Sequence, residues 1–419
     1  MNHVDRAIRP PLPSPLPQGE RELFCERSLA HGERELGRRE FLRAAGAASL
    51  SFWLPGVAWG APGAEYSRLL VLVELKGGND GLNTVVPYAD RAYYRLRPRL
   101  AAPRDQVLQL DAKSGLHPSL EALMPLWQQR ELAIVQGVGY PDPNLSHFRS
   151  IEIWDTASDS HAYLEDGWLA RAFRAAPPPP DFGADGVVFG SAELGPLGGG
   201  ARVVCLANPQ RFFQQARLAM PEGTARNAAL AHILKVERDI VQAAARLSFD
   251  RELKTGFPQG QFGNALKAAA QLIGGEGRVA AVKVSLNGFD THSNQPGTHA
   301  RLLQELAEGL AAFKAALIEV GRWDTALVMT YAEFGRRPRE NQSNGTDHGT
   351  VNAHFLMGGR VRGGLYGQAP QLERLEGSGN LAFAVDFRSL YATVLERWWG
   401  VPSSDVLGGR FPALDVLKA

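Results

Sequence analysis

Cysteine is nearly absent from this chain, which has only Cys25 and Cys205 in 419 residues. Because Cys25 precedes the leader described below, the mature chain would keep one cysteine, which excludes an internal disulfide and a cysteine-based metal site. An excess of one charge is also lacking, since the net charge is +1. Nucleic acid is therefore not expected as a partner. No later stretch has the roughly 18–20 uninterrupted apolar residues of a membrane span, so we expect a soluble mature protein without stable membrane insertion.

A twin-arginine pattern occupies residues 37–60. Arg38 and Arg39 stand directly before a weakly hydrophobic, alanine-rich run, and Ala58 and Gly60 are small residues placed for a cut after Gly60. The alternative is an ordinary amphipathic helix start. Paired arginines before an apolar run of this length favour a twin-arginine export signal. We therefore expect the twin-arginine export machinery as a partner and a periplasmic or otherwise exported location.

The remaining chain divides into an extension and one large domain. Residues 1–36 are proline-rich and contain GEREL twice, which indicates a disordered extension or sequence translated from a misassigned start. After residue 65, short apolar runs alternate with helical stripes, as in a parallel sheet whose strands are buried on both faces. The predicted strands are Leu69–Leu75, Leu132–Val138, Val187–Gly190, Val203–Leu206, Val279–Leu286, Ala326–Tyr331 and Ala353–Gly358.

Helical stripes are predicted at residues 226–247, 297–321 and 387–399. In the second, Leu306, Leu310 and Phe313 recur at spacings of four and three, which places them on one face. The alternation of strands and helices predicts an α/β fold with a mostly parallel sheet and helices on both faces. We expect one domain over 65–419, with a cap region inserted at about 177–272.

Polar segments follow four of the predicted strands. They are GGNDGLNT after the first strand, PNLSHFRS after the second, GFDTH after the strand at Val279, and EFGRR with GTDHG after the strand at Ala326. In an open α/β sheet, ligands bind beyond the carboxyl ends of the strands. A site at this edge is therefore predicted, although Asp80 in the first segment also suits an ordinary turn.

Carboxylates and imidazoles dominate these segments. Asp290 and His292 are two residues apart, so in an extended segment both side chains face the same side. Asp347 and His348 are adjacent, and His354 follows, although His354 alone also suits a buried core position. Without thiolates, such a set suits Zn²⁺ or Mn²⁺, with Mg²⁺ or Ca²⁺ an alternative if carboxylates dominate.

Ser146 precedes an amphipathic helix and has two interpretations. Serine is a preferred N-cap residue. A hydroxyl at a helix N-terminus also lies in a positive field that suits an anionic substrate, and a nearby metal ion would make it a nucleophile. Arg149, one turn further on, is a candidate contact for the anion.

These motifs resemble a known family. LVELKGGNDGLNTVVPY, PNLSHFRSIEIW, GFDTHSNQ, TYAEFGRR and GTDHG, in this order behind a twin-arginine leader, are similar to the family called domain of unknown function 1501. The resemblance covers nearly all of the mature chain. It implies a fold related to alkaline phosphatases and sulfatases, whose enzymes carry a two-metal site on one rim of the sheet.

The resemblance also implies roles for particular residues. Asp80 matches the aspartate after the first strand. Ser146 matches the nucleophile, with Thr84 as a second candidate. Asp290 and His292 match the pair after a middle strand.

The sequence departs from that pattern after the strand at Ala326. Glu333-Phe334 stands where the superfamily has Asp-His. Either Glu333 takes the aspartate role, or Asp347 and His348 supply the pair, and the late histidine is then His348 or His354. This departure leaves two ions, one ion or none as alternatives.

Two functions follow from the resemblance. The first is an exported, metal-dependent hydrolase of small phosphoesters or related anionic esters. Sulfate esters are the weaker choice, because the modified-cysteine signature of most sulfatases is missing. The alternative is a non-catalytic periplasmic binding or assembly protein that keeps the fold and part of the site.

Overall fold

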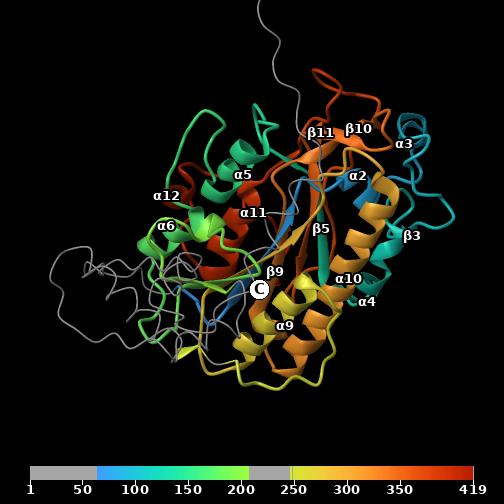
Figure 1. The fold of residues 1–419 in the computed structure, drawn as a ribbon. Coiled ribbons are helices and arrows are strands. Elements are labelled where there is room, and N and C mark those ends of the chain that lie inside the picture. Colours follow the sequence, from blue (N-terminus) through green and yellow to red (C-terminus); the bar gives the residue numbers. More distant parts are fainter. Residues whose placement is uncertain (1–63, 207–245, 248, 419) are drawn as a thin grey trace, which may run out of the picture. The chain divides into compact units, whose positions relative to one another are not determined.

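The computed structural model describes residues 64–206, 246–247 and 249–418 (Figure 1). The extension at 1–36, the leader at 37–60 and nearly all of the predicted helix at 226–247 lie outside the described residues. Among the helices that are described, none has both the length and the apolar character needed to cross a membrane.

Within the described residues, the main sheet contains nine strands: β1 (Leu69–Lys76), β5 (Leu132–Gly139), β6 (Gly186–Phe189), β7 (Val203–Leu206), β8 (Ala281–Asn287), β9 (Ala326–Tyr331), β12 (Asn352–Met357), β13 (Gly364–Gly367) and β14 (Val385–Asp386). Their order is β13-β5-β12-β9-β1-β8-β6-β7, with β14 also pairing with β5. All seven predicted strands are confirmed. Every pair is parallel except those of β12, which runs antiparallel to β5 and β9, so the sheet is mostly parallel, as predicted.

Helices cover both faces of this sheet (Figure 1). One face carries α5 (His147–Thr156), α6 (Trp168–Ala175), α11 (Arg388–Ala392), the π-helical turn η5 (Thr393–Trp399) and α12 (Ser404–Leu407). The other carries η2 (Pro118–Leu123), α4 (Met124–Gln128), α9 (Gln261–Gly274) and α10 (Gln295–Glu319). The predicted α/β architecture is therefore confirmed.

The apolar stripes of the helices are buried, as their spacing predicts. In α10, Leu306, Leu310 and Phe313 are fully buried. On the opposite face, Trp154 and Trp398 share a core cluster with side chains of β1, β5 and β9. At about 25 cal/mol per Å² of apolar surface, such burial is the main stabilising term of the fold.

The interval 177–272 was predicted to form a cap. Its described part contributes β6 and β7 to the main sheet and α9 to the covering helices, and β6 pairs directly with β8. Residues 207–245 of this interval lie outside the described residues.

Short elements lie beyond the carboxyl end of β1, where α2 follows that strand (Figure 1). They include α2 (Gly81–Thr84), α3 (Arg91–Leu96), and the antiparallel hairpin of β10 (Gly335–Glu340) and β11 (Thr346–Gly349). The remaining described elements are β2 (Val85–Val86), β3 (Leu108–Gln109), β4 (Gly115–Leu116), η3 (Gly195–Leu197) and η4 (Trp323–Thr325).

Candidate metal site

The carboxyl ends of β1 and β8 lie side by side, because the two strands pair in parallel. Asp80 follows β1 and Asp290 follows β8, so both polar segments lie at the same edge of the sheet. Arg336 of β10 joins the two segments. Its Nη2 donates to the carbonyl of Gly77 at 2.5 Å and to Oδ1 of Asp290 at 2.6 Å.

Three potential metal ligands meet at this edge. His147 is the first residue of α5, Asp290 follows β8, and His348 lies on β11. The Nε2 atoms of His147 and His348 lie 3.4 and 3.2 Å from Asp290 Oδ1, and the three ligand atoms are within 4.8 Å of one another. Among the described residues, this is the one group of His, Cys, Asp and Glu side chains whose spacing would let it hold a metal ion.

His292 adjoins this group. Its Nε2 lies 3.0 Å from Asp290 Oδ1 and 2.8 Å from the Nε2 of His348. Two imidazole nitrogens this close need a proton or a cation between them, because two lone pairs repel. Asp347 lies further out, with its Oδ1 3.8 Å from the Nδ1 of His292, and is exposed.

The histidine rings are oriented by their other nitrogens. The Nδ1 of His348 lies 2.7 Å from the carbonyl oxygen of Leu145, and the Nδ1 of His147 lies 2.7 Å from Oε1 of Glu333. Both partners accept, so each Nδ1 carries a proton, and in a neutral ring this leaves the lone pair on Nε2, which lies on the side of Asp290. Metal-binding histidines are held in this way. Glu333 therefore lies behind His147, and its Oε1 also accepts from the backbone N–H of Gly77 at 3.0 Å.

The electrostatics of these rings fit a cation. The Nε2 of His147 is buried without a hydrogen-bond partner among the described residues, although Asp290 lies near it. The hydrogen bond to Glu333 raises the pKa of His147 against partial burial. Burial lowers the pKa of His348, despite its contacts with Leu145 and Asp290. The negative charge of Asp290 would be balanced either by an imidazolium at His147 or by a divalent ion. Neutral imidazoles together with a carboxylate are a donor set that suits Zn²⁺ or Mn²⁺.

Asp290 is kept ionised by its neighbours. Partial burial alone would raise its pKa, but the hydrogen bond and charge of Arg336, with His348 and His292, lower the pKa to about 2. The backbone beside it requires glycine. Gly77 has a φ of +113°, and a Cβ there would lie 2.5 Å from the backbone nitrogen of Asp290. The glycines after β1 thus allow the two strand ends to approach.

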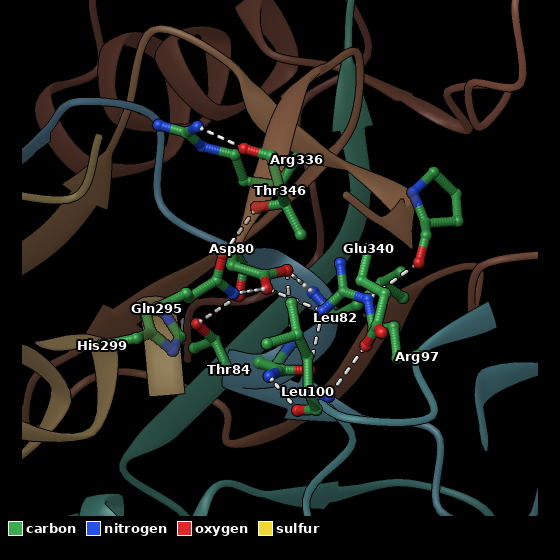
Figure 2. Close-up of polar contacts among 12 residues, drawn as sticks. Asp80, Leu82, Thr84, Arg97, Leu100, Gln295, His299, Arg336, Glu340 and Thr346 are labelled. Atoms are coloured by element: carbon green, nitrogen blue, oxygen red, sulfur yellow. Dashed lines mark hydrogen bonds and ion pairs between the residues drawn. The ribbon is translucent and has the colours of Figure 1, made fainter. Parts of the chain in front are cut away.

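Asp80 lies outside this group, in a buried polar network (Figure 2). Its side chain is fully buried, and Oδ2 accepts from Arg97 Nη1 at 2.6 Å and from Gln295 Nε2 at 2.5 Å. Oδ1 accepts from the backbone N–H groups of Leu82 and Asn83, so Asp80 is the N-cap of α2. Burial raises the pKa of Asp80, but Arg97 outweighs it and the pKa is lowered. Both carboxylate oxygens are thus engaged by protein donors.

Thr84 belongs to the same network (Figure 2). Its hydroxyl donates to the carbonyl of Asp80 at 2.8 Å and is hydrogen-bonded to the side-chain amide of Asn79. The side chain is buried. Thr84, the last residue of α2, is therefore held within the buried network of Asp80.

Ser146 and Arg149 differ in their surroundings. Ser146 is the exposed N-cap residue of α5, next to His147, and its hydroxyl makes no capping hydrogen bond. Arg149 is nearly buried, and its Nη2 donates to the carbonyls of Ser160 at 3.0 Å and Ala162 at 2.5 Å. Ser146 therefore adjoins the candidate metal group, whereas the guanidinium of Arg149 is used to hold the loop after α5.

His354 is fully buried in β12, away from the group. Its ring lies 5.2 Å from that of Trp154, and neither ring nitrogen has a hydrogen-bond partner among the described residues. Burial lowers its pKa to about 3. His354 therefore occupies a buried core position, the second of the two interpretations that its sequence context allowed.

Two residues of the site were not singled out from the sequence. His147 follows Ser146 in SHFRS. Its position at the start of a predicted helix that follows a strand was the signal that could have identified it. Arg336 is in EFGRR, and its role depends on carbonyls that only the fold brings near it, those of Gly78 and Phe289 among them.

The fold and this group define an α/β protein with a candidate histidine–aspartate metal site at the carboxyl edge of its sheet. The chain belongs to the family described as protein of unknown function DUF1501, whose model matches residues 67–407. The family suggested by the motifs is thereby confirmed. None of the curated proteins matches this sequence.

Several solved structures are similar to this chain at low identity. The lipoteichoic acid synthase of Listeria monocytogenes is 11% identical, with 87% of this chain and 81% of that chain covered and a TM-score of 0.37. A protein in the alkaline phosphatase superfamily from Vibrio parahaemolyticus is 11% identical over 90% and 78%, with a TM-score of 0.40. A phosphonate monoester hydrolase of Silicibacter pomeroyi is 11% identical over 84% and 76%, with a TM-score of 0.37.

Proposed function

We propose that this chain is an exported, metal-dependent hydrolase of phosphoesters or related anionic esters. The observation that carries the proposal is the convergence of His147, Asp290 and His348 with their Nδ1 atoms or carboxylate already anchored. Anchored ligands lose little freedom on binding an ion. Such an arrangement is typical of a built metal site rather than a chance surface cluster.

The proposed roles follow from the contacts. His147, Asp290 and His348 would hold a Zn²⁺ or Mn²⁺ ion, with His292 as a neighbouring ligand. A divalent ion bound there would supply stabilisation of negative charge on the ester. Glu333 and the carbonyl of Leu145 fix the imidazole rings, and Arg336 fixes the carboxylate.

Ser146 is the proposed nucleophile. It is exposed, opens the ten-residue helix α5 and precedes the ligand His147. The positive end of the helix favours an anionic group there. Thr84 is less suited to this role, because its buried hydroxyl already donates to a backbone carbonyl.

Metal content and turnover test the proposal separately. The purified chain, expressed with added Zn²⁺ and Mn²⁺, is expected to hold at least one ion by mass spectrometry of the metal. His348→Ala should lower the metal content tenfold or more, since removing one metal ligand cripples such sites. Ser146→Ala should keep the ion and abolish hydrolysis across a panel of phosphoesters, sulfate esters and phosphonates.

His161→Ala is the matched control, because His161 is an exposed histidine on the neighbouring loop, with a side chain 85% exposed. It should change neither the metal content nor turnover. A wild-type chain without a stoichiometric ion would refute the metal site. A bound ion without turnover on any substrate would favour the binding or assembly alternative.

Export by the twin-arginine route is proposed from Arg38 and Arg39. Replacing both with lysine should leave unprocessed precursor in the cytoplasm, because the pathway recognises the arginine pair. Fractionation followed by immunoblotting measures the outcome, with Arg43→Lys as control. Unchanged processing of the Arg38→Lys/Arg39→Lys variant would contradict this route.

A further inference from the structure

Large apolar side chains are exposed at few places in the described part of the chain. The most exposed are Phe148, at 88%, and Tyr163, at 76%; Leu164, Ile318 and Phe383 are exposed to a lesser degree. Isolated apolar residues on a surface are normal. The position of the two most exposed rings is unusual, because both belong to the first turn of α5 or to the loop packed on it.

Phe148 is covalently adjacent to the proposed metal ligand His147. Neighbouring Cα atoms are about 3.8 Å apart, and successive helical residues point about 100° apart around the axis. The side chains of His147, Phe148 and Arg149 therefore point in three different directions around the first turn of α5. His147 points to Asp290, Arg149 points to the loop after the helix, and Phe148 projects between them into solvent.

Tyr163 lies on the loop after α5 and is held there by Arg149, the residue that follows Phe148. The guanidinium carbon of Arg149 lies 3.9 Å from the centroid of its ring, which is close enough for a cation–π interaction. The same guanidinium donates to the carbonyls of Ser160 and Ala162, so the loop is tied to the helix. Arg149 covers one face of the ring, and the large exposure leaves the other face open.

Phe383 adds an apolar side chain at the same edge of the sheet. A Cβ on Gly139, the last residue of β5, would lie 2.9 Å from the Cβ of Phe383 and 2.7 Å from the carbonyl oxygen of Thr350. Thr350 is two residues beyond the ligand His348. Exposed apolar side chains therefore occur at the start of α5, next to His147, and near the residue that follows β11.

We propose that Phe148 and Tyr163 form a subsite for an aromatic group of the substrate, so that the substrate class is aryl-bearing anionic esters rather than small polar phosphates. The inference rests on the proposed function. Flat rings pair with aromatic side chains in offset or edge-to-face geometry, and a ring that is already held, as Tyr163 is by Arg149, loses little entropy on binding. Arg149 would act here as the support of Tyr163.

Binding of non-hydrolysable ligands tests the subsite without requiring turnover. Phenylphosphonate, octylphosphonate and methylphosphonate would be titrated calorimetrically into the Zn²⁺-loaded chain. We expect phenylphosphonate to bind about tenfold more tightly than methylphosphonate, from the apolar area that a phenyl ring buries. Phe148→Ala and Tyr163→Ala should each reduce this preference at least threefold, and the double variant should remove it.

Ile318→Ala is the control, because Ile318 is also an exposed apolar residue, 54% exposed, near the end of α10. It should leave the preference unchanged, and every variant should retain the wild-type metal content. Octylphosphonate bound more tightly than phenylphosphonate would overturn the assignment to an aryl group. Equal affinity for the phenyl and methyl ligands, or a preference that survives in the double variant, would overturn the subsite.

The outcomes separate this proposal from the hydrolase proposal. A chain that holds its ion but binds both small phosphonates equally refutes the subsite alone. A phenyl preference that depends on Phe148, in a metal-bound chain without turnover, supports the subsite and refutes hydrolysis. A chain that holds no ion and binds no phosphonate refutes both.

Discussion

Replacing Arg97 with methionine is expected to destabilise the fold by about 3–5 kcal/mol, because it leaves the Asp80 carboxylate buried without a charge partner. Both side chains of this ion pair are fully buried, at a distance of 2.6 Å. Arg97 also donates to the carbonyls of Pro338 at 2.8 Å and Arg337 at 2.9 Å, so it ties α3 to β10. Urea unfolding followed by circular dichroism measures the loss.

Arg95→Met is the matched control, two residues earlier in α3, the helix whose C-cap residue is Arg97. Arg95 pairs with Glu373, and both side chains are more than half exposed. Exposed ion pairs are screened by solvent and contribute little, so the control should change stability little. A second variant identifies the cause: Asp80→Asn combined with Arg97→Met should recover part of the loss, since the unpaired charge is then gone. A loss below about 1 kcal/mol for Arg97→Met would contradict this account.

Acidification from pH 7 to pH 5 is expected to destabilise the protein through its buried histidines. Burial lowers the pKa of His354 to about 3, and it does the same for His299 despite the opposing charge of Asp80. Unfolded histidine titrates near pH 6.5. Between pH 6.5 and pH 3 the unfolded chain therefore binds more protons, so the stability present above pH 6.5 falls as the pH falls. Each histidine contributes a slope of up to about 1.4 kcal/mol per pH unit.

His354→Phe isolates one of these contributions. The wild type minus variant difference in unfolding free energy, measured by urea titration at several pH values, should decline by about 1.4 kcal/mol per pH unit below pH 6. Other titrating groups cancel in this difference. The variant should also match the wild type in metal content, because His354 lies outside the candidate metal group. His161→Ala, at an exposed histidine, should leave the slope as in the wild type; a parallel pH profile for His354→Phe would refute the prediction.

Much of the architecture could be predicted from local patterns. The runs that form β1, β5, β8 and β9 are mostly apolar, as expected for strands that are buried on both faces, and the apolar residues of α10 recur at helical spacing. The direction of β12 could not be read in this way, because an apolar run has the same pattern in a parallel and an antiparallel strand. The segment GFDTH could be placed at the edge of the sheet, since parallel strands end together.

The candidate site was only partly predictable. Asp290 and His348 could be selected as ligands by type and by their position after strands. Asp80 has the same type and position as Asp290, yet the two differ in their partners. Asp80 faces Arg97 and Gln295, and the latter is 215 residues away in the chain. Such a partner lies beyond any local pattern.

The sequence by itself determined the α/β class, seven strands of the sheet, the family and the edge at which polar residues gather, because these depend on periodicity and on motifs within short segments. Only the tertiary structure decided which carboxylate lies beside the histidines. It brought His147, Asp290 and His348 together from three distant segments, and it gave Asp80 to a buried guanidinium. The physical reason is that a side chain's chemistry depends on the donors, charges and solvent within a few ångströms, and folding chooses these neighbours.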